Sequence, residues 1–240
     1  MTSVAESLSS WRASLLPNIP IGGLLSRNPT VYKWKAPFRC WLLREAALWR
    51  QTDLLTQSLS LHEQGHGLGA RILLRSGFET FAALLYLNYN MKAVLDGQLD
   101  FHAFGELTTR LVVGAKNDPD RPVAVNVITM IDKGEKKYPG LRSLYGHLSE
   151  SAHPNFEGMM WGYSKVDHDL YETNFSNRWM DLHGASHLGD LEICIKVFHH
   201  EYNDVWPELM ASLEDWIVLN DARLEEGRAS NAENEPPPVK

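Results

Sequence analysis

Four residues within a short stretch of the chain have side chains that could bind a phosphate or transfer a proton. Arg142, His147, Glu150 and His153 all lie between residues 138 and 163. A guanidinium can neutralise a phosphate, and an imidazole can donate or accept a proton near neutral pH. On a helical wheel the two histidines and the glutamate fall on an arc roughly opposite the apolar face. We therefore treat the four as candidate catalytic residues. Two alternatives stay open: Glu150 is an ordinary exposed glutamate, and His153 caps the end of its helix.

A second set of ionisable residues interrupts the most apolar stretch of the sequence. Arg71, Arg75 and Glu79 are spaced i, i+4 and i+8, so they form one line along an otherwise apolar helix. Burying unpaired charge is costly, so this stripe must pair internally, meet partners on another helix or face water. Two interpretations follow. Either Arg75 and Glu79 form a structural pair at the edge of the core, or the three are binding residues that line a polar pocket or a dimer interface.

A third pattern could bind a metal ion. His183, His187, Asp190 and Cys194 follow one another at i, i+4, i+7 and i+11, and all four side chains are ligand types for zinc or a related ion. The stretch has no HExxH motif, and Cys194 also fits an apolar stripe in which a small buried thiol is common. Metal binding by these residues is therefore one alternative, and a cysteine packed in the core is the other.

Apolar residues that recur every three and four positions predict the helices that carry these groups. The expected helices cover residues 38–59, 70–95, 101–114, 123–137, 139–153, 187–202 and 207–226. Alternation with a period of two near residues 158–176, around a polar turn, predicts a small β-hairpin insert. The expected fold class is therefore all-α, a helical bundle of about six to seven helices with one hairpin inserted.

Proline content and polarity divide the chain into three parts. Residues 1–35 contain three prolines and are expected to form an N-terminal arm that lies on the domain. Residues 36–225 are expected to form a single helical domain. Residues 226–240 are polar and rich in proline, which predicts a disordered tail.

The composition argues against several classes of protein. A formal net charge of −7 argues against a broad surface that coats nucleic acid, but it is compatible with a small basic site. Cys40 and Cys194 lie far apart, which favours a reducing cytosol over a disulfide framework. The first residues do not resemble a signal peptide, and no apolar run approaches the roughly 20 residues of a membrane span. We therefore expect a soluble, cytoplasmic protein. The sequence has no Gly-rich phosphate loop, and we expect no cofactor.

The stretch RSLYGH, Arg142 to His147, resembles the R-x4-6-H motif of HEPN domains, small helical proteins that often dimerise and include endoribonucleases. The resemblance implies a homodimer that acts on RNA without a metal ion. Arg142 would neutralise the scissile phosphate, His147 would act on the 2′-hydroxyl or the leaving oxygen, and Ser143 matches the polar residue that commonly follows the arginine. Local positive charge for the RNA backbone would come from Lys133, Lys136 and Lys137.

Helix geometry bears directly on this motif. Residues five apart on an unbroken helix point about 140° away from each other, so Arg142 and His147 converge only if the helix is loosened near Gly146 or in its first turn. The same spacing occurs a second time, from Arg178 to His183, with a tryptophan after the arginine.

A broader likeness covers residues 68–160. ARILLRSGFETFAALLYL, followed by YGHLSESAHPNFEG, is similar to a group of uncharacterised bacterial helical proteins that share a central helix bearing arginine and glutamate and a late LSE-x-x-HP segment. The likeness implies a polar cluster of Arg75, Glu79, Glu150 and His153, and no particular activity. Three hypotheses follow: a metal-independent endoribonuclease acting as a toxin or defence effector, a non-catalytic dimeric interaction or ligand-binding module with a structural Arg/Glu/His network, or a metal-binding helical protein.

Overall fold

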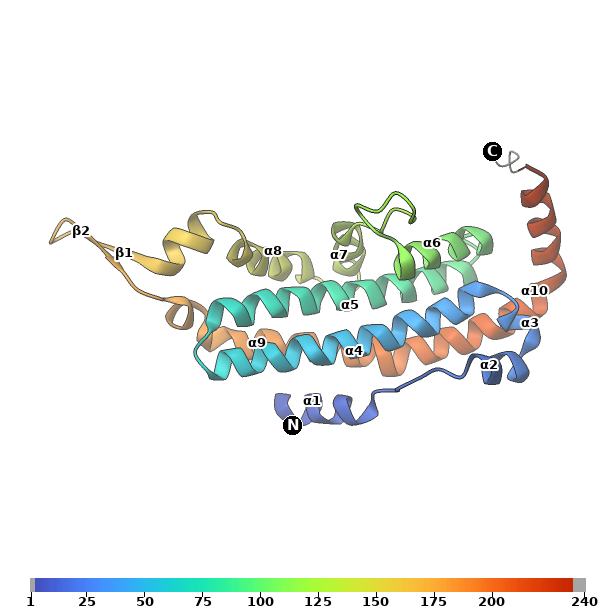
Figure 1. Cartoon of the computed structure of the whole chain (residues 1–240), viewed down its shortest axis with the longest axis horizontal. Helices are drawn as coiled ribbons and strands as arrows, with labels where there is room; N and C mark the ends of the chain where they lie inside the picture. Colours follow the sequence, from blue (N-terminus) through green and yellow to red (C-terminus); the bar gives the residue numbers. More distant parts are fainter. Residues whose placement is uncertain (1–2, 235–240) are drawn as a thin grey trace. The chain divides into compact units, whose positions relative to one another are not determined.

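The computed structural model describes residues 3–234, and the all-α prediction with a small hairpin is confirmed. Within these residues the α-helices are α1 (Val4–Ser14), α2 (Ile21–Arg27), α3 (Pro29–Tyr32), α4 (Lys35–Glu63), α5 (Gly67–Leu95), α6 (Phe101–Val113), α7 (Val127–Glu135), α8 (Leu141–Ala152), α9 (Trp179–His200) and α10 (Trp206–Asn234). Two π-helical turns, η1 (Phe156–Trp161) and η2 (Glu201–Val205), and strands β1 (Ser164–Asp167) and β2 (Glu172–Phe175) complete the described fold. Figure 1 shows the order of these elements along the chain.

The seven helices expected from periodicity correspond to α4 through α10, and α1 to α3 add to them. Side-chain caps stabilise two of the additional helices: at α1, Ser3 accepts a hydrogen bond from the backbone N–H of Glu6, and at α3, Asn28 does the same for Val31. At the other end of the chain, α10 continues to Asn234, so residues 226–234 are helical rather than disordered. Residues 235–240 of the predicted tail lie outside the described residues.

The described chain forms two compact units, each assembled from three separate segments. Within the described residues, unit 1 combines residues 3–15, 45–85 and 126–200, and unit 2 combines residues 16–44, 86–125 and 201–234. The helices α4 and α5 each contribute residues to both units. The single domain expected over residues 36–225 stays a prediction.

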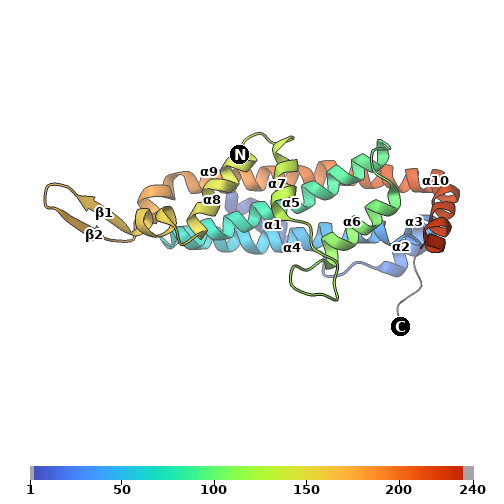
Figure 2. The same ribbon diagram turned by 90° about the horizontal axis from the view of Figure 1, so that it is seen from above.

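In unit 1, α8 lies beside the N-terminal half of α5, as both ribbon views show (Figures 1 and 2) and as hydrogen bonds between the two helices require. The core holds fully buried apolar side chains from α4, α5, α8 and α9: Leu55, Leu74, Phe78, Phe81, Leu148, Leu191 and Phe198. The arm contributes Trp11, whose ring centroid lies 5.2 Å from that of Phe198. At Gly77, α4 and α5 approach closely: a Cβ there would lie 2.7 Å from the end of the Leu55 side chain, which would have to shift.

Unit 2 has its own core, in which aromatic rings surround one guanidinium. The Arg44 guanidinium lies 3.6 Å from the centre of the Tyr202 ring and 4.6 Å from that of Trp206. Asn88 donates a hydrogen bond of 2.8 Å to the buried carboxylate of Glu201. The second part of the expected arm packs here, because Arg27 forms an ion pair of 2.6 Å with Glu214. No helix in residues 3–234 combines the length and the apolar content that crossing a membrane requires.

The hairpin is confirmed over Ser164–Phe175, but the segment before it is not a strand. Strands β1 and β2 pair antiparallel, with Ser164 opposite Phe175 and Asp167 opposite Glu172. The alternation that began at residue 158 falls instead on the π-helical turn η1, where the Asn155 side chain accepts a hydrogen bond from the backbone N–H of Gly158. A side chain at Gly158 would collide with the carbonyl oxygen of His153, so this tight turn requires glycine.

Candidate functional site

The charged stripe on α5 meets polar acceptors on α8. The Arg71 Nε donates a hydrogen bond of 2.8 Å to Ser151, and its Nη2 donates one of 3.1 Å to the carbonyl oxygen of His147. One turn along, the Arg75 Nε donates a hydrogen bond of 2.9 Å to the Ser149 hydroxyl. Both arginines therefore find partners on another helix, which is one of the three alternatives for this stripe.

Arg75 and Glu79 form the structural pair that their spacing allowed. Their side chains lie 3.1 Å apart, and the Tyr145 hydroxyl accepts a hydrogen bond of 2.8 Å from Arg75 while it donates one of 2.8 Å to Glu79. Burial and the neighbouring Glu79 carboxylate raise the pKa of Tyr145, so the phenol stays protonated and keeps this donor role. These three residues join α5 to α8.

Arg71 differs from Arg75 because it has no carboxylate partner. Only 4% of its surface is exposed, and among the described residues no acidic group lies within 4.0 Å of its guanidinium. Burial lowers the pKa of Arg71, while the more distant Asp190 and Glu157 oppose this effect. A buried guanidinium with only neutral hydrogen-bond partners is an uncommon and costly arrangement.

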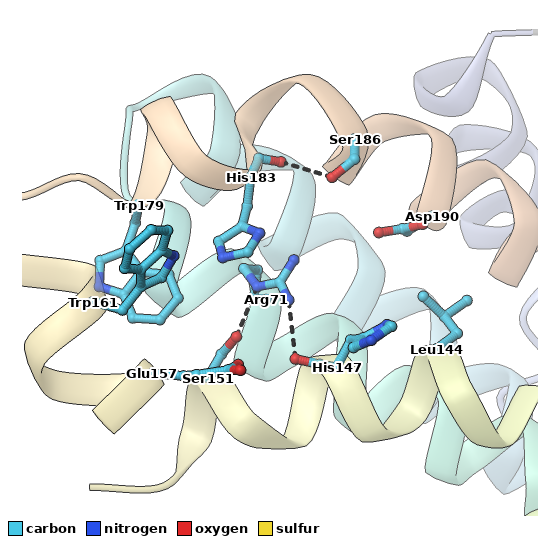
Figure 3. Close-up of a pocket in the computed structure, with 10 residues that line it drawn as sticks. All are labelled: Arg71, Leu144, His147, Ser151, Glu157, Trp161, Trp179, His183, Ser186 and Asp190. Atoms are coloured by element: carbon cyan, nitrogen blue, oxygen red, sulfur yellow. Dashed lines mark hydrogen bonds between the residues drawn. The ribbon is translucent and has the colours of Figure 1, made fainter. Parts of the chain in front are cut away.

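Arg71 lines a pocket of about 450 Å³ formed by α5, α8, η1 and α9, drawn in Figure 3. Leu144, His147 and Ser151 form its wall on α8. His183, Ser186 and Asp190 form the opposite wall on α9, and Figure 3 shows the His183 ring directed at Arg71. Because all of these residues lie on regular helices, the pocket has rigid walls.

The α9 wall carries two groups whose pKa values are displaced toward the neutral form. Burial lowers the pKa of His183 to about 4, helped by the positive charge of Arg71. Burial also raises the pKa of Asp190, against the opposing effect of Arg71. His183 is therefore uncharged at neutral pH and can accept or donate a hydrogen bond without adding charge to the pocket.

Two tryptophans close the end of the pocket toward the hairpin. Trp179 is 1% exposed, and its ring stacks on His183 with the centroids 5.6 Å apart and the planes 27° apart. Trp161, in η1, is 46% exposed, and the Arg178 guanidinium lies 5.1 Å from its ring centre. Arg178 also donates a hydrogen bond of 3.1 Å to the Trp161 carbonyl oxygen, so it fixes the base of the hairpin and does not line the pocket.

The candidate motif pair, Arg142 and His147, does not converge within the chain. His147 lines the pocket, whereas Arg142 lies in the exposed first turn of α8 with its Nε 3.6 Å from Asp132. The helix runs unbroken from Leu141 to Ala152, so the angular separation expected for this spacing is retained.

Glu150 and His153 also lie away from the α5 stripe. The Glu150 carboxylate accepts a hydrogen bond from the Asn155 side chain, and His153 is exposed at the C-terminal end of α8. The face of α8 that packs on α5 carries Tyr145 and Leu148, and the two candidates lie around the other side of the helix. The expected cluster of four residues is therefore reduced to Arg75 and Glu79.

The α9 stripe does not form a metal-ligand set. His187 is 2% exposed and lies 3.1 Å from the Ser58 hydroxyl, and the buried Cys194 accepts a hydrogen bond of 3.1 Å from Gln51. Only His183 and Asp190 reach the pocket. An i to i+11 stripe is about 16 Å long, too long to surround one ion. Across residues 3–234, no three histidine, cysteine, aspartate or glutamate side chains gather in a way that could hold a metal.

Sequence reasoning missed the residues that complete the pocket. Trp161 and Trp179 carry no motif, and Glu157 and Ser186 resemble ordinary surface residues. A usable signal was present for Ser151, because a buried arginine on α5 requires acceptors on the helix that covers it. His183 and Asp190 were recognised, but for a different chemistry.

Comparison with models of known protein families, with characterised proteins and with solved structures found no match for this chain. The resemblance to HEPN domains therefore stays a prediction, and the function of the pocket is argued from its geometry.

Proposed function

We propose that the pocket around Arg71 is a ligand-binding site for an anionic group, such as a phosphate or a carboxylate. The observation that carries this proposal is the buried Arg71 guanidinium, which lines the pocket and has only neutral hydrogen-bond partners. An anion would supply the missing charge partner, and charge-assisted hydrogen bonds to a guanidinium are among the strongest available in a protein.

Two carboxylates, Asp190 and Glu157, line the same pocket. Burial raises the pKa of Asp190, which favours its uncharged form. Glu157 is exposed, so solvent and salt screen its charge. His183 is uncharged at neutral pH and could donate a further hydrogen bond to a ligand held by Arg71.

The test is a titration of the full chain with phenyl phosphate, followed by the fluorescence of the tryptophans and by the NMR signal of the Arg71 side chain. We expect saturable binding that Arg71→Met abolishes. The matched control is Arg75→Met, one turn along the same helix, where the arginine is already paired with Glu79. Circular dichroism of both variants checks that they are folded. Binding that survives Arg71→Met, or an absence of binding to the parent chain, would overturn the proposal.

A second candidate function is metal-independent cleavage of RNA, and one observation favours it. His147 and His183 line the same pocket from facing helices, together with Arg71. Two imidazoles could serve as general base and general acid for attack of a 2′-hydroxyl, and the guanidinium could neutralise the phosphate. This assignment keeps the predicted activity but replaces Arg142 with Arg71.

RNA cleavage is tested by incubating a mixed-sequence RNA with the chain in the presence of a chelator. If the pocket is responsible, His183→Ala and His147→Ala abolish cleavage and Arg142→Ala does not. If the R-x4-6-H motif is responsible, Arg142→Ala abolishes cleavage and His183→Ala has little effect. An intact RNA in every reaction would refute this function. The predicted homodimer is checked separately, by light scattering coupled to size-exclusion chromatography.

A further inference from the structure

A second hollow, of about 420 Å³, is lined by α5, α8 and α9, which also line the Arg71 pocket, and by the segment that joins α7 to α8. Its lining is mainly apolar. The helices contribute Phe78 and Phe81 from α5, Leu141 and Leu144 from α8, and Ile193 and Val197 from α9, and the segment before α8 contributes Lys137, Tyr138, Pro139 and Gly140. Volumes of this size suit small molecules or alkyl chains, whereas a helix of a partner protein is about 10 Å wide and needs a broader groove.

The apolar hollow and the Arg71 pocket meet at Leu144, which lines both. Each of the three helices changes from polar to apolar at this point. On α5, Arg71 is followed by Phe78 seven residues later, and on α9, Asp190 is followed by Ile193. On α8, which runs antiparallel to α5, the order is reversed, with Leu144 before His147. We call these two adjoining hollows the groove: its Arg71 end is charged, and its other end is mainly apolar, with Lys137 among the lining residues.

We propose that this groove binds a free anionic amphiphile, a molecule with a phosphate or carboxylate head and an unbranched apolar chain. The inference rests on the proposed anion site and extends it. The anionic head binds Arg71, and the alkyl chain of the ligand runs past Leu144 over Phe78 and Phe81. Arg71 and Phe81 are ten positions apart, about 15 Å along the helix, and this distance sets the length of alkyl chain that the groove can hold.

The charge distribution selects this occupant over an uncharged one. The charged end contains a buried guanidinium without a carboxylate partner. At the apolar end Ile193 is 48% exposed, and an alkyl chain that covers it would bind more tightly because apolar surface is removed from water. The buried position of Arg71 also favours a single free molecule over a lipid in a membrane, since a membrane lipid keeps its head in water and its chain in the bilayer.

The experiment compares four probes on the full chain by calorimetry, below their micelle concentrations: inorganic phosphate, butyl phosphate, octyl phosphate and the uncharged octyl glucoside. Each buried methylene is expected to strengthen binding by about fourfold, so octyl phosphate, with four more methylenes, should bind about 250-fold more tightly than butyl phosphate. Octyl glucoside should bind far more weakly than octyl phosphate.

The possible results separate the two proposals. Equal affinity for inorganic phosphate, butyl phosphate and octyl phosphate would refute the proposal of an amphiphile and would still support the anion site. Equal affinity for octyl phosphate and octyl glucoside would overturn the role of the charged head. An absence of binding by every probe would overturn both proposals. Co-sedimentation with vesicles of phosphatidic acid would overturn the choice of a free amphiphile over a membrane surface.

Two variants of α9 test where the alkyl chain of the ligand lies. Ile193→Asp places a charge in the apolar end, and we expect it to reduce the affinity for octyl phosphate to that for butyl phosphate without changing the affinity for inorganic phosphate. Leu188→Asp is the matched control, because Leu188 is 43% exposed on the same helix and lines neither hollow. Equal effects of the two substitutions on octyl phosphate binding would contradict the assignment.

Discussion

The protonation state of His187 gives a quantitative test of how α9 packs in unit 1. The Ser58 hydroxyl donates a hydrogen bond of 2.8 Å to the carbonyl oxygen of Ala70 and lies 3.1 Å from the Nε2 of His187. Because the hydroxyl proton is already used, His187 must donate its Nε2–H to Ser58. Its Nδ1 is buried and has no hydrogen-bond partner among the described residues. A second proton would therefore create a buried cation with no acceptor, and burial lowers the pKa of His187 to about 4.

The sign and size of the effect follow from linkage between protonation and folding. In the unfolded chain the histidine has its ordinary pKa of 6.5, and in the folded chain it has a pKa of about 4. Between these values the unfolded state binds more protons, so the free energy of unfolding falls as the pH is lowered. Acidification from about pH 7 to about pH 5 should cost about 2 kcal/mol through His187 alone.

The assay is urea unfolding at both pH values for the parent chain and for His187→Gln. Glutamine cannot titrate, and its amide N–H can still donate to Ser58. All other titrating groups are common to the two proteins, so their contributions cancel in the comparison. The parent should lose about 2 kcal/mol more than the variant on acidification. An identical loss in both proteins would refute the assigned tautomer and the low pKa.

Two further predictions concern stability. Replacing Glu79 with alanine removes the partner of Arg75, a part-exposed pair worth about 1 kcal/mol, and should lower the melting temperature by about 2–4 °C in calorimetry; an unchanged melting temperature would show that the pair is not stabilising. Gly162→Ala should destabilise the chain by about 1–3 kcal/mol, because the new Cβ would lie 2.5 Å from the Trp179 ring. Gly189→Ala, in the middle of α9 with open space around it, should instead add up to about 1 kcal/mol, and the reverse order of the two glycine variants would contradict the packing described for η1 and α9.

The periodicity of apolar residues was sufficient to predict the helices from α4 to α10 and the hairpin, because each pattern depends on local geometry alone. The same physics identified the α5 stripe as a feature that needs partners. Arg75 and Glu79 then paired as their i, i+4 spacing allows. These features could be predicted because each depends on the spacing of residues along a single segment.

The pocket could not be predicted because it depends on how three helices are placed around Arg71. Spacing along one helix suggested that Arg142 and His147 act together, yet the regular α8 directs only His147 into the pocket. Spacing along α9 likewise grouped His183 with His187, although one faces the pocket and the other faces Ser58. A one-dimensional pattern does not contain the rotation of one helix relative to its neighbours.

The hairpin formed by β1 and β2 offers a practical opportunity for protein engineering. Its tip, residues 168–171, is exposed, with 94% of the Tyr171 surface and 67% of the Leu170 surface in contact with solvent. Exposed loop tips are the positions where chains best tolerate insertions. An epitope tag or a fluorophore placed there would leave the helical packing unaltered. Because β1 contacts η1, which carries Trp161, such a label would also report on the neighbourhood of the pocket.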